Sequence, residues 1–198
     1  MPLCPGRAIF RRAIFLRLGA CATLGLAAAG TPDADAQAHP DCTQLLQAGD
    51  AQAVPACKAQ VEEAESAPAT ERMPRIVADD EYGVALLAIA HQPKQSLEPF
   101  SRAIELLPAS TVKPDSLQWA VTYWHRATAY QQLAQWEQAD TDLATAEDAF
   151  TKAIAAAAGD VPLTQHFTQL RQRVRLQHAD VLERQGKHRE AQKILATQ

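Results

Sequence analysis

The residues that most often carry catalysis or bind metals are present in this sequence, but their spacings do not bring them together. The six histidines fall at no i, i+3 or i+4 interval, the spacing that would place two metal ligands on one helix face. No Cys/His cluster with zinc-binding spacing occurs. We therefore expect no metal site and no cofactor, and we expect each histidine at the surface. The histidines are His39, His91, His125, His166, His178 and His188.

The hydroxyl and carboxylate residues form no catalytic motif. The sequence has no G-x-S-x-G, no H-E-x-x-H and no glycine-rich phosphate loop. Four neighbouring carboxylates predict a solvated helix face. They are Asp140, Asp142, Glu147 and Asp148. We predict that the protein is not an enzyme, and an enzyme that uses His125 or His166 with nearby carboxylates stays open as the alternative.

The composition predicts that helices position all of these residues. The chain has 198 residues, of which 47% are hydrophobic and only 6% aromatic, and alanine dominates the hydrophobic share. Ala, Leu, Gln, Glu and Arg favour helices, and β-branched runs are scarce. We expect an all-α protein of one domain, with one removable segment.

The first 38 residues are predicted to be a secretory signal peptide. A basic start precedes the apolar segment 18–29, and Ala36-Gln37-Ala38 is a small-x-small cleavage sequence. The apolar segment is shorter than the roughly 20 residues of a membrane span. Cleavage after Ala38 would leave a periplasmic or secreted chain, residues 39–198, with no stable membrane span.

A lipid anchor is the alternative to this cleaved leader. Leu18-Gly19-Ala20-Cys21 has the form of a lipoprotein box, in which Cys21 would become the acylated first residue. The protein would then be a membrane-tethered assembly factor of the cell envelope. Arg17 interrupts the apolar run just before the box, and this favours the cleaved leader.

Two helical patterns follow each other in residues 123–150. Tyr123, Ala127 and Tyr130 share one helix face, and a second pattern begins at Trp136 after a break around Ala134. Small residues alternate with aromatic ones across the pair, which lets two helices pack closely. The hairpin resembles a tetratricopeptide repeat (TPR), with fainter copies before and after it. The resemblance implies an α-solenoid that works as a protein-binding scaffold.

About four antiparallel helical hairpins are expected in the mature chain. Their predicted bounds are 41–66, 74–108, 114–158 and 162–197. Prolines such as Pro74 and Pro114 suit the first turn of a helix. Pro99 is expected to bend its helix or delay its start, and Gly83 stands where the family usually has a large residue.

The repeat pattern also implies a disulfide in the first hairpin. On this pattern Gly49 is the turn glycine, and Cys42 on the first helix lies opposite Cys57 on the second. The other two cysteines, Cys4 and Cys21, belong to the leader. In an oxidising compartment we expect a Cys42–Cys57 bond that staples the terminal hairpin. Two buried free thiols are the alternative if the chain stays in the cytosol.

In proteins that this chain resembles, the first helix of each hairpin lines a groove that holds the partner. We expect such a groove here, with an unidentified protein or peptide as the partner. Trp124 is its boldest candidate contact, because exposed tryptophans often dominate interfaces, and packing of this indole against the adjacent repeat stays open as the alternative. The predicted groove residues are Trp124, Thr128, Gln131, Gln132, Arg173, Asp180 and Arg184. The basic clamp for acidic chaperone tails has no counterpart, so that function is excluded.

Charge is divided unevenly along the chain. Residues 39–160 contain eight basic and eighteen acidic residues, a net charge of −10, whereas residues 161–198 contain seven basic and three acidic, a net of +4. A basic last hairpin could steer an acidic partner or allow head-to-tail self-association. A solubilising helix that happens to use arginine is the alternative. The overall charge of −4 and the predicted export argue against nucleic acid as a partner.

Overall fold

The computed structural model of the chain describes residues 41–66, 68, 70, 72–109, 113 and 116–196. All regular secondary structure in these residues is helical, which confirms the all-α prediction. The predicted signal peptide and the alternative lipid site at Cys21 lie outside the described residues.

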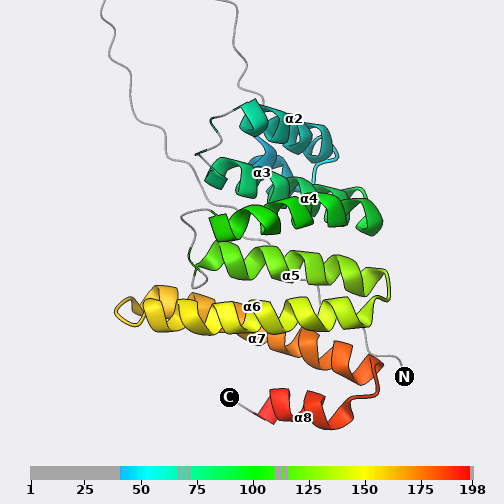
Figure 1. Cartoon of the computed structure of the whole chain (residues 1–198), viewed down its shortest axis with the longest axis vertical. Helices are drawn as coiled ribbons and strands as arrows, with labels where there is room; N and C mark the ends of the chain where they lie inside the picture. The colour runs from blue at the N-terminus through cyan, green and yellow to red at the C-terminus, as the bar shows by residue number, and fades with distance from the viewer. Residues whose placement is uncertain are drawn as a thin grey trace, which may run out of the picture. The chain divides into compact units, whose positions relative to one another are not determined.

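The helices pair into antiparallel hairpins that stack in chain order (Figure 1). They are α1 (Cys42–Ala48), α2 (Ala53–Ser66), α3 (Arg72–Val84), α4 (Pro93–Leu106), α5 (Leu117–Gln132), α6 (Trp136–Ala156), α7 (Val161–Arg184) and α8 (His188–Ala196). A π-helical turn, η1 (Ala85–Ile89), extends α3, and a 3-10 turn, η2 (Leu107–Ala109), follows α4. This arrangement is the stack of hairpins that the TPR resemblance implied.

Polar caps set where several helices begin. Asp41 caps α1 and Asp160 caps α7, each by accepting a backbone N–H three residues further on, at 2.8 and 3.0 Å. Ser116 caps α5 in the same way at 3.2 Å. The cap starts α5 at Leu117, and the predicted start of this hairpin at residue 114 lies outside the described residues. The second hairpin begins at Arg72, two residues before the expected Pro74.

Gly83 departs from the family pattern because a phenylalanine occupies the space beside it. A Cβ atom at Gly83 would lie 2.5 Å from Cε1 of Phe100, which is fully buried. The ring of Phe100 therefore fills the space that a side chain on α3 would need. Pro99, the residue before it, lies inside α4, and the helix still begins at Pro93, so the start is not delayed.

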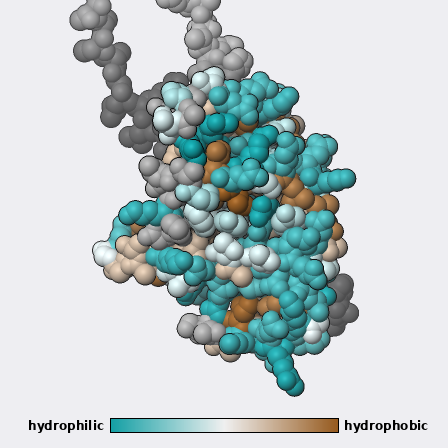
Figure 2. All heavy atoms as spheres, viewed as in Figure 1, coloured by the Kyte–Doolittle hydropathy of each residue, from teal (hydrophilic) through white to brown (hydrophobic). Residues whose placement is uncertain are grey.

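The largest hydrophobic cluster lies between α5, α6 and α7. Ala127 of α5 and Ala139 of α6 are both fully buried, with Leu143, Phe150 and Val174 around them. Alanines allow the helix axes to approach, and the large side chains fill the remaining space. On the outside, hydrophilic side chains cover most of the face seen in Figure 2, while paler residues gather at the α6–α7 turn.

The first hairpin contains the predicted disulfide. The sulfur atoms of Cys42 and Cys57 are 2.03 Å apart and join α1 to α2. Gly49 ends α1 with a φ of 67°, the left-handed conformation that glycine tolerates best. In the part of the chain that the structure describes, no helix is long and apolar enough to cross a membrane.

Candidate partner-binding groove

One amide side chain ties α5 to α7 along the face where the groove was predicted. Gln177 of α7 accepts a hydrogen bond from Nε1 of Trp124 at 2.6 Å. Its Nε2 donates to the hydroxyl of Thr128 at 3.0 Å and contacts the side-chain oxygen of Gln131. Three of the seven predicted groove residues therefore converge on Gln177, which was not among the predicted groove residues.

The helical register of α7 would have pointed to Gln177. Arg173, Asp180 and Arg184 had been assigned to one face of this helix, and Gln177 falls between them at the i+4 position from Arg173. The sequence did not show that this face of α7 packs against α5. A residue 49 positions from Thr128 in sequence becomes its neighbour only when the hairpins stack.

The structure places Trp124 partly inside the stack. Its indole is half-buried, packs edge-on to Phe150 with ring centroids 6.4 Å apart, and its N–H is already bonded to Gln177. Only part of the ring therefore remains available to a partner. The sequence could not decide this, because the ring of Phe150 comes from the next helix.

The other four predicted groove residues lie at the solvent-exposed margins of this face. Gln132 ends α5 and Arg173 lies on α7, and both are exposed. Asp180 and Arg184 are exposed too, and they form an ion pair at 2.9 Å. The guanidinium of Arg184 also stands 5.1 Å from the ring centroid of Trp136. We give the name α5–α7 groove to the surface on which a partner is predicted to bind, which comprises Trp124, Thr128, Gln131, Gln132, Arg173, Gln177, Asp180 and Arg184.

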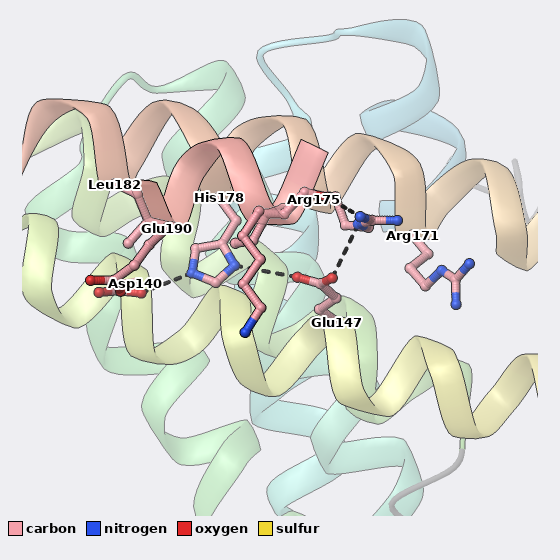
Figure 3. A pocket seen from close by; sticks show the side chains of 9 residues that line it. Asp140, Glu147, Arg171, Arg175, His178, Leu182 and Glu190 are labelled. Atoms are coloured by element: carbon pink, nitrogen blue, oxygen red, sulfur yellow. Dashed lines mark hydrogen bonds and ion pairs between the residues drawn. The ribbon is translucent and has the colours of Figure 1, made fainter. Parts of the chain in front are cut away.

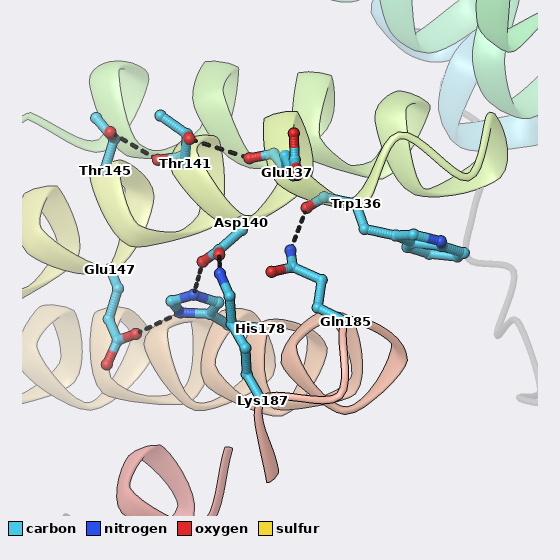
Figure 4. Close-up of polar contacts among 9 residues, drawn as sticks. All are labelled: Trp136, Glu137, Asp140, Thr141, Thr145, Glu147, His178, Gln185 and Lys187. Atoms are coloured by element: carbon cyan, nitrogen blue, oxygen red, sulfur yellow. Dashed lines mark hydrogen bonds and ion pairs between the residues drawn. The ribbon is translucent and has the colours of Figure 1, made fainter. Parts of the chain in front are cut away.

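The opposite face of α7 carries a charged cluster around a buried histidine. Nε2 of His178 lies 2.8 Å from Oδ1 of Asp140, and Nδ1 lies 3.3 Å from Oε2 of Glu147 (Figure 4). Lys187 bonds the other oxygen of Asp140 at 2.7 Å, and Arg175 pairs with Glu147 at 3.2 Å. These five residues form what we call the His178 cluster.

The geometry of the His178 cluster favours a protonated imidazole. Only the imidazolium has two N–H groups, and here both ring nitrogens face a carboxylate oxygen. Burial by itself pulls the pKa of His178 down, but the hydrogen bonds and charges of Glu147 and Asp140 outweigh it and leave the pKa raised. Burial likewise pushes the pKa of Asp140 up, while Lys187 and His178 together bring it below its usual value.

Two predictions about exposed residues were wrong. The carboxylates of α6 do not form one solvated face, because Asp142 is buried and Asp140 and Glu147 face His178. Of the four carboxylates, only Asp148 forms a solvent-exposed ion pair, with Lys152 at 2.6 Å. The histidines are not all at the surface either, since His178 is only 6% exposed.

Asp142 is buried because Arg126 of α5 neutralises it. The guanidinium donates to both carboxylate oxygens, at 2.7 and 2.9 Å. The rings of Tyr123 and Tyr130 flank the same guanidinium, at 5.7 and 5.6 Å from their centroids. Burial lowers the pKa of Arg126, but the bond to Asp142 more than offsets this, so the group stays charged. Arg126 is thus half of a buried ion pair between α5 and α6.

The two histidines named for an enzymatic alternative have different surroundings. Nδ1 of His125 lies 3.1 Å from each carboxylate oxygen of Asp80, and its ring packs beside Phe100. His166 is exposed at the start of α7. A His–Asp pair of this kind orients the ring and stabilises its charge, and here it joins α5 to α3. Among the described residues, no group of three or more His, Cys, Asp or Glu side chains could hold a metal ion.

Comparisons with known proteins return structural neighbours only. No protein-family model matches the chain, and no curated protein matches it. A crystal structure from Podosopora anserina, of a kinesin light chain protein with nearly identical TPR-like repeats, is similar with a TM-score of 0.47 and 16% sequence identity. The match covers 78% of this chain and 88% of that one. A single-substitution variant of the same protein matches with a TM-score of 0.46 at 16% identity, over 78% and 87% of the two chains.

Proposed function

We propose that this protein is a non-enzymatic binding module of the bacterial periplasm or cell envelope, which holds a segment of a partner protein in the α5–α7 groove. The observation that carries the proposal is the amide of Gln177, fixed between Trp124, Thr128 and Gln131. A binding surface whose polar side chains are already ordered loses little conformational entropy when a partner binds.

The chemistry of the α5–α7 groove suits a polypeptide. A peptide backbone offers alternating N–H and C=O groups, and glutamine side chains carry both a donor and an acceptor. Gln132 and Arg173 are exposed at the margins and free to approach such a chain. The part of the Trp124 indole that stays exposed supplies apolar contact area beside these polar groups.

The proposed compartment rests on two features. The leader has the charge and cleavage pattern of an exported chain. The Cys42–Cys57 disulfide fits the same setting, because structural disulfides persist in oxidising compartments and are rare in the cytosol.

Site-directed photo-crosslinking in intact cells tests the groove. A photo-reactive amino acid at position 132 would stand at the margin of the α5–α7 groove, and the same residue at position 172 provides a matched control. Gln172 is also an exposed glutamine, but it lies off the groove face of α7. We expect a discrete crosslinked protein from position 132 and none of that size from position 172.

A second variant separates binding from folding. Gln177→Ala removes the ordered amide and should reduce the crosslink from position 132 several-fold while the circular dichroism spectrum stays helical. Equal crosslinks from positions 132 and 172, or an unchanged crosslink in Gln177→Ala, would count against the groove.

The mature N-terminus decides between the free and the tethered form. Mass spectrometry of the purified protein should find a chain that begins at His39. An acylated chain that begins at Cys21 would instead establish the membrane-tethered assembly factor.

A further inference from the structure

A hollow of about 480 Å³ lies between α6, α7 and α8, on the face of α7 opposite the α5–α7 groove (Figure 3). It is lined by the His178 cluster, apart from Lys187, and by Arg171, Leu182, Glu190, Lys193 and Ile194. We call it the α6–α8 hollow. Its volume lies within the range of about 300–1,000 Å³ that small-ligand sites occupy.

Most charges in the α6–α8 hollow are already matched by neighbours. Asp140 is held by Lys187 and His178, and Glu147 by Arg175 and His178. Arg175 also donates to the backbone carbonyl of Ile194, which fixes α8 against α7. These groups have little capacity left for a ligand.

Arg171 differs from these groups. In the described part of the chain its buried Nε has no hydrogen-bond partner, and Figure 3 shows its guanidinium set apart from the bonded groups. Two other arginine Nε atoms share this condition, but Arg175 pairs with Glu147, and Arg75 has the charge of Asp79 nearby. A guanidinium presents its donors in a fork that matches a carboxylate.

The surroundings of Arg171 restrict which kind of ligand could bring a carboxylate to its guanidinium. Ile194 lines the same hollow, and its backbone carbonyl accepts a hydrogen bond from Arg175, which lies one helical turn from Arg171 on α7. It offers an apolar surface beside the site. Glu190 and Lys193 place one charge of each sign in the rest of the lining.

We propose that the α6–α8 hollow binds a ligand that carries one carboxylate next to an apolar group, with Arg171 holding the carboxylate and Ile194 contacting the apolar group. The C-terminal residue of a peptide and a free branched organic acid both offer this chemistry. The site is distinct from the α5–α7 groove and faces the other side of the same helix.

Nuclear magnetic resonance titration of the full protein with three matched small molecules tests the site. N-acetyl-leucine carries the carboxylate, the isobutyl group and an amide. N-acetyl-leucinamide lacks the charge, and 4-methylpentanoate lacks the amide. We expect N-acetyl-leucine to shift the side-chain Nε–H signal of Arg171 in a saturable manner, and N-acetyl-leucinamide to leave it unchanged. If 4-methylpentanoate binds as well, the site accepts free acids, and if it does not, a peptide terminus is the ligand.

Two arginine variants give the control. Arg171→Gln removes the proposed carboxylate partner and should weaken binding about tenfold or more, as expected for a hydrogen bond to a charged group. In this variant the binding is followed by the backbone amide signals of α8. Arg173→Gln makes the same charge change two residues away, on the groove face, and should alter the dissociation constant less than about twofold. No shift with N-acetyl-leucine, equal shifts with the acid and the amide, or equal losses in both variants would overturn the proposal.

Discussion

The two ends of the stack are held together by different means. At the N-terminal end, α1 and α2 are joined by a covalent bond and a small cluster that includes Leu45 and Ala53. In the C-terminal half, α5 to α8 are joined by buried ion pairs around Asp142 and His178 as well as by the largest hydrophobic cluster. Among the described residues, each end hairpin has a neighbouring hairpin on one side only, so burial alone contributes less at either end.

The difference matters because the disulfide and the buried ion pairs respond to different solution conditions. A disulfide restricts the unfolded chain whatever the pH, and it fails only under reducing conditions. Ion pairs depend on the protonation of their members, and a buried charge without its partner is costly. The N-terminal end should therefore respond to the redox state, and the C-terminal half to pH.

The largest expected effect is in the ion-paired half. Arg126→Ala leaves the carboxylate of Asp142 buried and unpaired, and breaking such a pair costs about 3–5 kcal/mol of unfolding free energy. Chemical denaturation measures the loss. Lys152→Ala, which removes an exposed pair with Asp148, is the control and should cost no more than about 0.5 kcal/mol. Similar losses in both variants would mean that burial does not distinguish the two pairs.

Loss of the disulfide should have the next largest effect, confined to the N-terminal end. The double variant Cys42→Ser, Cys57→Ser frees a loop with a sequence separation of 15, for which about 3 kcal/mol is expected. Hydrogen exchange should show faster exchange in α1 and α2, with α7 and α8 unchanged. Faster exchange along the whole stack would show that the ends are not independent.

The third prediction concerns the pH response of the C-terminal half. Folding raises the pKa of His178 above 6.5, so its stabilising contribution is complete below pH 6.5 and is lost as the pH rises through the raised value. Folding lowers the pKa of Asp140 below 3.8, so that contribution holds above pH 3.8 and is lost as the pH falls through the lowered value. We expect the His178 cluster to be most stabilising between these two limits.

His178→Gln tests this response, because glutamine cannot donate to both carboxylates as a cation. At pH 6 the variant should lose about 1.5–3 kcal/mol, the range for hydrogen bonds to charged groups, and the loss should shrink as the pH is raised. Unfolding curves of the two proteins at several pH values measure it. A loss that is constant with pH would mean that His178 contributes by packing alone.

The smallest expected effect lies on the exposed surface of α7. Arg184→Ala removes an open ion pair with Asp180 and a contact with the ring of Trp136, together worth up to about 1 kcal/mol. Arg173→Ala, an exposed arginine on the same face, should be neutral within about 0.5 kcal/mol. A loss in Arg184→Ala as large as that in Arg126→Ala would erase the contrast between exposed and buried charges.

The helices and their pairing followed from local sequence. Periodic apolar residues predicted α5 and α6, and the break between them, where Ala134 has a φ of 56°, was expected around Ala134. The disulfide followed from the repeat pattern of one hairpin. These features depend on residues that are near one another in sequence, so a single stretch contains the information.

The polar contacts between hairpins did not follow. Asp142, Asp140 and Glu147 looked like a solvated face because their partners, Arg126 and His178, lie 16 to 38 residues away. Gln177 was overlooked for the same reason, although its register on α7 was known. Each side chain acquires its role from a neighbour on another helix.

The sequence by itself determined that this chain forms helices and where they turn, because hydrophobic period, caps and glycine conformations act within a few residues. Only the tertiary structure decided which charges are buried, which face of α7 meets α5 and which lines the α6–α8 hollow, and how Trp124 is covered. Those outcomes depend on stacking, which brings distant helices into contact and sets the burial and pairing of every polar group between them.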